Sequence, residues 1–327
     1  MSIRCHFAVM ALLITAMFAH LLSESPGQAI PRRGDSKSST KKPNLVSIES
    51  GIDAILKRHG HEVEAAVWVG GVEGKPYFER NANQIMPSAS AIKTFFLVEF
   101  FASRKDALNA PVAAADTILA DDSHPAISHF TADQKQDIRK TLAGRSAREI
   151  GEIMMGKAPA SNVAYNAAAN VITAVMGGPE RLTASIQARD PAFSKVFVRR
   201  YMLRDRNEQG DNEASAEALS TLYRNLANGS LNRIEPKTLD AIRNAVIRTG
   251  NSTEGFEYMK TGALNSDPLT RVEAGWKEPA QGKEPIVFVV MLRQSRPGTG
   301  QTRDDAGKAL AAACTSIRKM LLESAGP

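Results

Sequence analysis

The 327-residue sequence predicts an α+β fold of three layers, in which helices flank both faces of an antiparallel five-stranded sheet and an all-helical lobe is inserted between the two halves of that sheet. Two observations lead to this prediction. Residues 90–226 are mostly helical in their hydrophobic period and in their content of alanine, leucine, arginine and glutamate. Short β-type runs lie towards the two ends of the chain, at 63–70, 76–79, 255–260, 271–276 and 285–292.

The elements near the two ends of the chain predict the outer layers. From Leu45, apolar residues recur with the three-and-four spacing of an amphipathic helix, which Gly60 ends. The run 286–292, Ile-Val-Phe-Val-Val-Met-Leu, contains no polar residue and predicts a central strand that is covered on both faces. A stripe of apolar residues from Ala306 to Leu321 predicts a long helix that lies on the sheet.

The first 43 residues have the pattern of a secretory signal followed by a tether. An apolar run begins after His6, and small residues follow it, so we expect a signal peptide over residues 1–29. An uncleaved membrane anchor is the alternative, because the run is near the lower length limit for a spanning helix. Residues 30–43 are basic and rich in serine and proline, which is typical of a disordered linker.

Composition excludes several kinds of function. The net charge is +6, but residues 1–43 hold six basic and two acidic side chains, so four of the six charges belong to the tail and a nucleic-acid groove is not indicated. Cys5 lies in the predicted signal, which leaves Cys314 without a disulfide partner. The six histidines include no HExxH or Cys/His ligand pattern, and we expect no metal and no cofactor.

Ser90 and Lys93 form the first candidate catalytic pair. The Ser-x-x-Lys spacing is weak by itself, because it also begins at Ser38, Ser39 and Ser316. Around Ser90, however, apolar residues point in every direction of the following helix, so that Lys93 should be buried. A buried lysine is a usual general base, and side chains at i and i+3 share one face of a helical turn. The alternative is a serine cap with a lysine that extends to the surface.

Lys260-Thr261-Gly262 is the second candidate and the only Lys-Thr-Gly in the chain. It ends a β-type run, and such a strand presents a cation, a hydroxyl and a bare backbone together. Glycine allows an acyl group to lie against the strand, and the N–H of Ala263 can point at a developing oxyanion. As an isolated tripeptide, it would be an ordinary strand end.

Asn162 is the third candidate, in Ala160-Ser161-Asn162 at the head of an alanine-rich helical stretch that also contains Asn166 and Asn170. An amide side chain donates and accepts hydrogen bonds, so Asn162 can hold a substrate amide and Lys93 in register. The alternative is an ordinary helix cap.

These three elements resemble the motifs of class A β-lactamases and the related penicillin-binding proteins, which share Ser-x-x-Lys, Ser-x-Asn and Lys-Thr-Gly in this order. The likeness spans about residues 44–323. It implies a β-lactamase/DD-peptidase-like fold with a catalytic domain over 44–325. The resemblance divides this domain into an α/β lobe, 44–85 plus 227–325, and a helical lobe, 86–226.

The resemblance also implies a role for each residue. Ser90 attacks the substrate, Lys93 takes its proton, and Asn162 orients the substrate amide. The backbone N–H groups of Ser90 and Ala263 hold the oxyanion. Beside the bare backbone of Gly262, three side chains bind the substrate carboxylate, namely those of Lys260, Thr261 and Arg271.

The chain departs from the family pattern at two points. Ala160 stands where the first serine of Ser-x-Asn belongs, which leaves the proton relay to Ser161 or to a water. The deacylating glutamate of class A enzymes lacks its usual Glu-x-x-Leu-Asn surroundings. Glu208 is the nearest candidate for this base, with Asp205 and Glu213 behind it, and surface carboxylates are the alternative for all three.

The sequence therefore predicts a secreted or periplasmic, monomeric serine hydrolase of the class A β-lactamase type, which opens a small β-lactam or a peptidoglycan-like amide through an acyl-enzyme on Ser90. No nucleic acid and no stable membrane span after signal cleavage are expected. Two alternatives stay open. A penicillin-binding DD-peptidase or esterase-like enzyme with slow deacylation fits the missing glutamate, and a non-catalytic binding protein with this fold fits Ala160.

Overall fold

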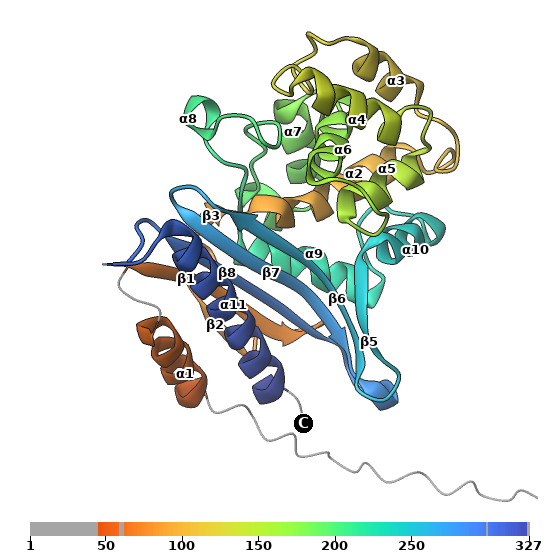
Figure 1. The fold of residues 1–327 in the computed structure, drawn as a ribbon. Coiled ribbons are helices and arrows are strands. Elements are labelled where there is room, and N and C mark those ends of the chain that lie inside the picture. The colour runs from red at the N-terminus through yellow and green to blue at the C-terminus, as the bar shows by residue number, and fades with distance from the viewer. Residues whose placement is uncertain (1–44, 59–61, 299, 326–327) are drawn as a thin grey trace, which may run out of the picture. The chain divides into compact units, whose positions relative to one another are not determined.

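The predicted antiparallel sheet is present, and it has six strands rather than five (Figure 1). The computed structural model describes residues 45–58, 62–298 and 300–325, so the predicted signal peptide (1–29) and linker (30–43) lie outside the described residues. The strands lie in the order β2 (Phe78–Arg80), β1 (Val63–Gly71), β8 (Ile286–Gln294), β7 (Leu269–Glu278), β6 (Gly255–Leu264) and β5 (Ile247–Asn251).

The five-stranded prediction was wrong because it missed β5. This strand reads Ile-Arg-Thr-Gly-Asn and is exposed along most of its length, so it has none of the apolar alternation by which a strand is recognised. It pairs on one side only, antiparallel to β6, from Ile247 opposite Met259 to Asn251 opposite Gly255. An edge strand of this kind is held by its backbone hydrogen bonds more than by burial of side chains.

Helices cover both faces of the sheet, as the sequence predicts. On one face, α1 (Leu45–Arg58) and α11 (Arg303–Ala325) pack on alternate residues of the central strands, such as Val290 of β8. On the other face, α9 (Ala216–Asn228) packs on the remaining residues, such as Val289 (Figure 1). The prediction of a doubly covered strand over 286–292 is therefore confirmed.

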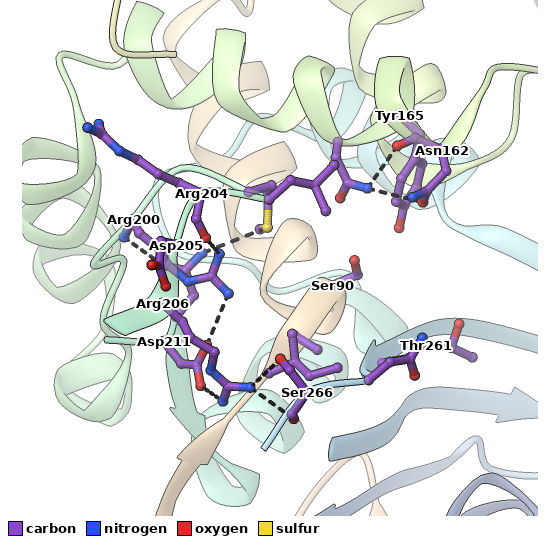
Figure 2. A pocket seen from close by; sticks show the side chains of 18 of the residues that line it. Ser90, Asn162, Tyr165, Arg200, Arg204, Asp205, Arg206, Asp211, Thr261 and Ser266 are labelled. Carbon is purple, nitrogen blue, oxygen red and sulfur yellow. Dashed lines mark hydrogen bonds and ion pairs between the residues drawn. The ribbon is translucent and has the colours of Figure 1, made fainter. Parts of the chain in front are cut away.

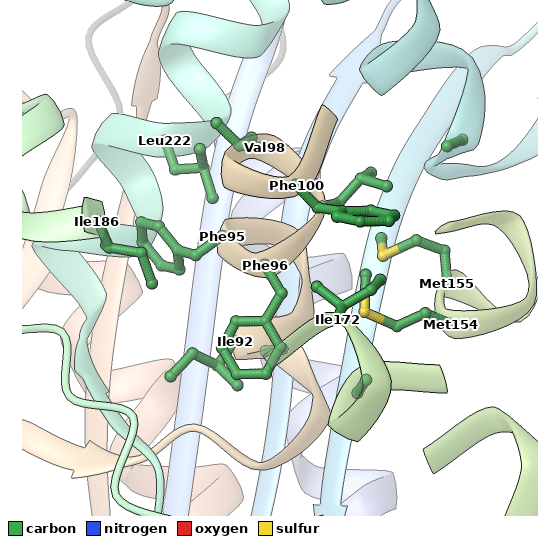
Figure 3. Close-up of a cluster of buried hydrophobic side chains, with 14 of the residues drawn as sticks. Ile92, Phe95, Phe96, Val98, Phe100, Met154, Met155, Ile172, Ile186 and Leu222 are labelled. Atoms are coloured by element: carbon green, nitrogen blue, oxygen red, sulfur yellow. The ribbon is translucent and has the colours of Figure 1, made fainter. Parts of the chain in front are cut away.

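The remaining helices gather mainly at one side of the sheet. Among them, α2 is buried on every side from Lys93 to Phe101, as its apolar sequence predicts (Figure 3). The division into lobes at 86–226 stays a prediction. The other helices are α3 (Ala113–Ala120), α4 (Ala132–Leu142), α5 (Ala147–Met155), α6 (Asn162–Val175), α7 (Pro179–Arg189), α8 (Arg206–Gln209) and α10 (Pro236–Ala245), with α2 at Lys93–Ser103.

Two short strands, β3 and β4, and the 3-10 turn η1 complete the described elements that surround the site. A second sheet of two antiparallel strands joins β3 (Ile85–Pro87) to β4 (Glu213–Ser215). The 3-10 turn η1 (Ala89–Ile92) leads from β3 into α2 and contacts β6.

None of the described helices has the length and apolar character needed to cross a membrane.

Candidate active site

A cavity of about 790 Å³ opens where η1, α6, β6 and the loop before β4 meet. Most of the residues singled out in the sequence line it, although they come from four separate stretches of the chain. The cavity-lining residues among them are Ser90, Asn162, Asp205, Lys260, Thr261 and Ala263 (Figure 2).

Ser90 lies on the η1 turn and is half-buried. The residue before it, Ala89, has a φ of 47°, a left-handed conformation that costs energy for any residue other than glycine. The turn is fixed from below, since both the backbone N–H and the hydroxyl of Ser88 donate to the carbonyl oxygen of Asn212, each at 2.9 Å. The turn therefore presents Ser90 to the cavity from a rigid support.

Lys93 is fully buried one turn further along. Its Nζ donates to Oδ1 of Asn166 at 2.9 Å and lies 3.2 Å from the centre of the Tyr165 ring. Among the described residues no carboxylate lies within 4.0 Å of this nitrogen. Burial, and secondly the charge of Lys260, lowers the pKa of Lys93 well below its usual value, so a neutral amine capable of taking a proton is favoured.

Strand β6 forms the side of the cavity that lies next to Ser90. Its pairing with β5 ends at Met259, which leaves the edge of Lys260–Leu264 that faces away from β7 unpaired. Gly262 allows this edge to approach η1 closely, because a Cβ there would lie 2.8 Å from the carbonyl oxygen of Ser88. Lys260 is 4% exposed, and its Nζ donates to the carbonyl oxygen of Thr261 at 3.1 Å. A cation and free backbone groups are thus brought beside Ser90.

Asn166, rather than Asn162, is the amide that contacts Lys93. Both side chains lie on α6 one turn apart, and Nδ2 of Asn166 donates to the backbone oxygen of Asn162 at 2.8 Å and to Oδ1 of Asn162 at 3.2 Å. Asn162 lines the cavity but reaches the lysine only through Asn166. The sequence reasoning missed Asn166 and Tyr165. The signal in the sequence that could have identified Asn166 is its spacing of four residues from Asn162, which places both side chains on the same helix face.

Ser161 and its neighbour Ala160 contribute nothing to the lining of the cavity. Ser161 caps α6, where its hydroxyl accepts from the N–H of Ala164 and donates to Asp137 of α4 at 2.5 Å. The hydroxyl that the family places in Ser-x-Asn therefore has no counterpart at these two positions.

Arg271 is not brought into the cavity. Its guanidinium donates to the carbonyl oxygens of Leu264 and Thr270, at 3.0 and 2.8 Å, and to Oδ1 of Asn265 at 2.9 Å. It lies on the face of β7 next to α11, close to Gly307. With its N–H groups engaged in this way, Arg271 has no place beside Ser90 in this structure.

Glu208 is also absent from the cavity lining. Its side chain is 58% exposed on α8 and lies 3.6 Å from Arg204. Two carboxylates do line the cavity, but Asp205 accepts from the N–H of Asn207 as a helix cap, and Asp211 is held by two arginines. Glu213 pairs with Arg199 outside the cavity.

The loop before β4 is held in place by two buried amides. Asn170 of α6 accepts from the N–H of Met202 at 2.5 Å and donates to its carbonyl oxygen at 3.1 Å. Asn212 accepts from the N–H groups of Arg199 and Arg200 through its Oδ1. Met202, which lines the cavity, is therefore fixed there with an uncharged side chain.

Several solved structures are similar to this chain over most of their length. An ancestral class A β-lactamase matches with a TM-score of 0.62 and 16% identity, over 85% of this chain and 99% of the other. The β-lactamase from Streptomyces albus G matches with 0.57 and 16%, over 83% and 99%. PBP-A matches with 0.57 and 18%, over 84% and 97%. No protein-family model and no curated protein sequence matches the chain.

This likeness establishes the fold, and the chain has the class A β-lactamase/penicillin-binding-protein-like fold that the sequence motifs predict. The site adds to this fold a serine on a strained turn, a buried lysine one helical turn away and an open strand edge across from them.

Proposed function

We propose that this chain is a serine hydrolase that is acylated at Ser90 by β-lactams or related amides and that releases the acyl group slowly. The observation that carries the proposal is the burial of Lys93 beside Ser90 without a carboxylate partner among the described residues. This makes Lys93 a base for the attack of the serine, whereas neither carboxylate of the described cavity lining is free to act as a second base for the attack of water.

The acylation step uses groups that line the cavity, together with Lys93, which is buried one turn along the chain from Ser90. Ser90 Oγ adds to the substrate carbonyl while its proton passes to Nζ of Lys93. The N–H groups of Ser90 and Ala263 donate hydrogen bonds to the oxyanion. The C–N bond then breaks, the leaving nitrogen takes the proton that Lys93 holds, and an ester to Ser90 remains. Lys260 and Thr261 offer a cation and a hydroxyl to a substrate carboxylate.

Slow deacylation follows from the carboxylates that are engaged elsewhere. Hydrolysis of the ester needs a water and a group that takes its proton, but Asp205 caps a helix and Asp211 is neutralised by arginines. PBP-A, one of the similar structures, has been solved as a variant in an acyl-enzyme complex with penicillin G. We therefore favour the penicillin-binding alternative over a fast β-lactamase and over a non-catalytic protein. On the signal-like residues 1–29, we place it in a secreted or periplasmic location.

The experiment is incubation of the chain with benzylpenicillin, followed over time by intact-protein mass spectrometry, with Ser90→Ala as the control. We expect one penicilloyl adduct on Ser90 that persists long after free penicillin is removed, and no adduct on the variant. Rapid loss of the adduct, with turnover of nitrocefin, would support the β-lactamase instead. Absence of any adduct on the wild-type chain would contradict the enzymatic proposal altogether.

A further inference from the structure

The loop side of the cavity holds two arginines that share one carboxylate. Nη2 of Arg200 lies 3.0 Å from Oδ1 of Asp211, and Nη2 of Arg206 contacts the other carboxylate oxygen. All three side chains are nearly buried, with exposed fractions of 9%, 13% and 9%. Two guanidinium groups against one carboxylate leave a surplus positive charge, which is costly in a buried place unless another anion offsets it.

Arg200 has hydrogen-bonding capacity that the protein leaves unused. The residue is 8% exposed and lines the cavity. Its Nη1 donates to the carbonyl oxygen of Arg204 at 2.8 Å and its Nη2 to Asp211, but its buried Nε has no partner among the described residues. A buried N–H of a charged group without an acceptor is unusual, and an anion in the cavity that Arg200 lines could supply the acceptor once the side chain shifts to expose its Nε.

Arg206 differs from Arg200 in that it also contacts a second segment of the chain. Its Nη1 donates to the backbone oxygen and to Oγ of Ser266, at 3.0 and 2.9 Å, and so ties the loop to the turn after β6. These two bonds explain the position of Arg206 without any ligand. It leaves the free Nε of Arg200 and the surplus charge unexplained.

The described cavity lining holds four basic side chains against two acidic ones, so its net charge stays positive; they are Arg200, Arg204, Arg206 and Lys260 against Asp205 and Asp211. Asp205, the second carboxylate that lines the cavity, forms no ion pair in the described residues. Lys260 likewise has no carboxylate within 4.0 Å there and adds a further positive charge. The cavity therefore attracts anions from two sides.

The two cationic sides flank the nucleophile. Figure 2 shows Ser90 between Thr261 on one side and the group of Arg200, Arg206 and Asp211 on the other. A substrate that places its leaving-group carboxylate at Lys260 and Thr261 directs its acyl portion towards the arginines. We propose that the natural substrate is dianionic, with a second carboxylate on its acyl portion that binds Arg200. This inference rests on the acylation of Ser90 proposed above.

The test compares two penicillins that differ by one carboxylate. Benzylpenicillin and carbenicillin share the same nucleus, and carbenicillin carries an extra carboxylate on the carbon next to the ring of its acyl side chain. We expect carbenicillin to acylate Ser90 with a second-order rate constant at least about ten-fold higher, which is the effect of one charge-assisted hydrogen bond. Intact-protein mass spectrometry at low ionic strength measures both rates.

Variants separate a specific contact from a general attraction. Arg200→Gln should bring the ratio of the two rates close to one, and Asp211→Asn, which frees more positive charge, should raise it. The ratio cancels any general loss of activity caused by a disturbed loop. Arg199→Gln is the matched control, because it removes the same charge from the same loop at a residue that lies outside the cavity and pairs with Glu213. This control should keep the wild-type ratio.

The outcomes distinguish the inference from the function on which it rests. Equal rates for the two penicillins in the wild-type chain would overturn the dianionic substrate while leaving Ser90 acylation intact. An equal fall of the ratio in Arg199→Gln and Arg200→Gln would also overturn it, because long-range charge would then be the cause. If neither penicillin labels Ser90, the proposed function itself fails and the inference falls with it.

Discussion

The two walls of the cavity around Ser90 are built for different tasks. The wall made of η1 and β6, with the start of α2 buried next to η1, holds two buried lysines, which are hydrogen-bonded to neutral oxygens and lack carboxylate partners among the described residues. The loop wall engages its carboxylates with arginines and backbone N–H groups and exposes the uncharged Met202 to the cavity. Under the proposed function, formation and breakdown of the acyl-enzyme are therefore separable steps, because only the first wall holds an obvious base.

The largest expected effect comes from the lysine of the first wall. Lys93→Met keeps the length of the side chain but removes the base, so we expect acylation of Ser90 to slow by about 10³-fold, within the usual range for general-base catalysis. The same variant should be more stable. At neutral pH the lysine is protonated in the unfolded chain, whereas burial lowers its pKa in the folded chain from 10.5. The unfolded state therefore binds more protons, and the burial of the lysine lowers the free energy of unfolding at pH values below 10.5.

Two measurements check this prediction. Urea unfolding at pH 7 should give Lys93→Met a free energy of unfolding about 1 kcal/mol above that of the wild type. In the wild type, the acylation rate should rise about ten-fold per pH unit below the lowered pKa of Lys93 and then level off well before pH 10. A rate that keeps rising to pH 10 would mean that the pKa of the lysine is not lowered, and would contradict the neutral amine on which the proposal depends.

A carboxylate introduced on the loop wall should supply the missing second step. Met202 is nearly buried, lines the cavity and has its backbone fixed by Asn170. Burial would raise the pKa of a carboxyl group at this position and favour its action as a base towards water. We expect Met202→Glu to speed the loss of the penicilloyl adduct by about 10²-fold, measured by the decay of adduct mass.

The matched control for this variant is Met202→Gln, which has the same shape without a base. Equal decay of the adduct in both variants would show that a disturbed loop admits water, and would remove the argument that a carboxylate is what the second wall lacks.

The sequence predicted the first wall better than the second. The motifs at Ser90 and Lys260 are local, and the all-apolar surroundings of Lys93 already indicate its burial. Asn166 was missed because the choice between asparagines one helical turn apart depends on how α6 is rotated against Lys93, and the sequence motif does not fix that rotation.

The loop before β4 was harder still to predict, because ion pairs decide which of its carboxylates are free to act as a base. Asp211 and Glu208 look alike in so charged a segment, and only the fold shows that the first is nearly buried between two arginines while the second points to solvent. Similarly, β5 was missed because backbone pairing with β6, rather than an apolar pattern, holds it.

A smaller effect is expected where the first wall depends on close packing. In Gly262→Ala the new Cβ would meet the carbonyl oxygen of Ser88 at 2.8 Å, so β6 must move away from the turn that carries Ser90. We expect acylation to slow by about ten-fold, since the oxyanion donors are displaced, with a loss of roughly 1–3 kcal/mol in stability from overpacking. Gly74→Ala serves as the control, because nothing lies within 4 Å of that position although its φ of 78° strains the variant. Equal slowing in both variants would trace the effect to stability alone.

The smallest expected effect concerns Glu208, next to the second wall. Glu208 is the carboxylate that the sequence suggests for deacylation, yet it is 58% exposed and lies outside the cavity. An exposed pair such as Glu208 and Arg204 contributes little to stability, and a base must lie within reach of the water it activates. We therefore expect Glu208→Gln to change the decay rate of the adduct by less than about two-fold. A large fall in that rate would mean that α8 moves over the acyl-enzyme and brings Glu208 to Ser90, and the contrast between the two walls would then describe only the free protein.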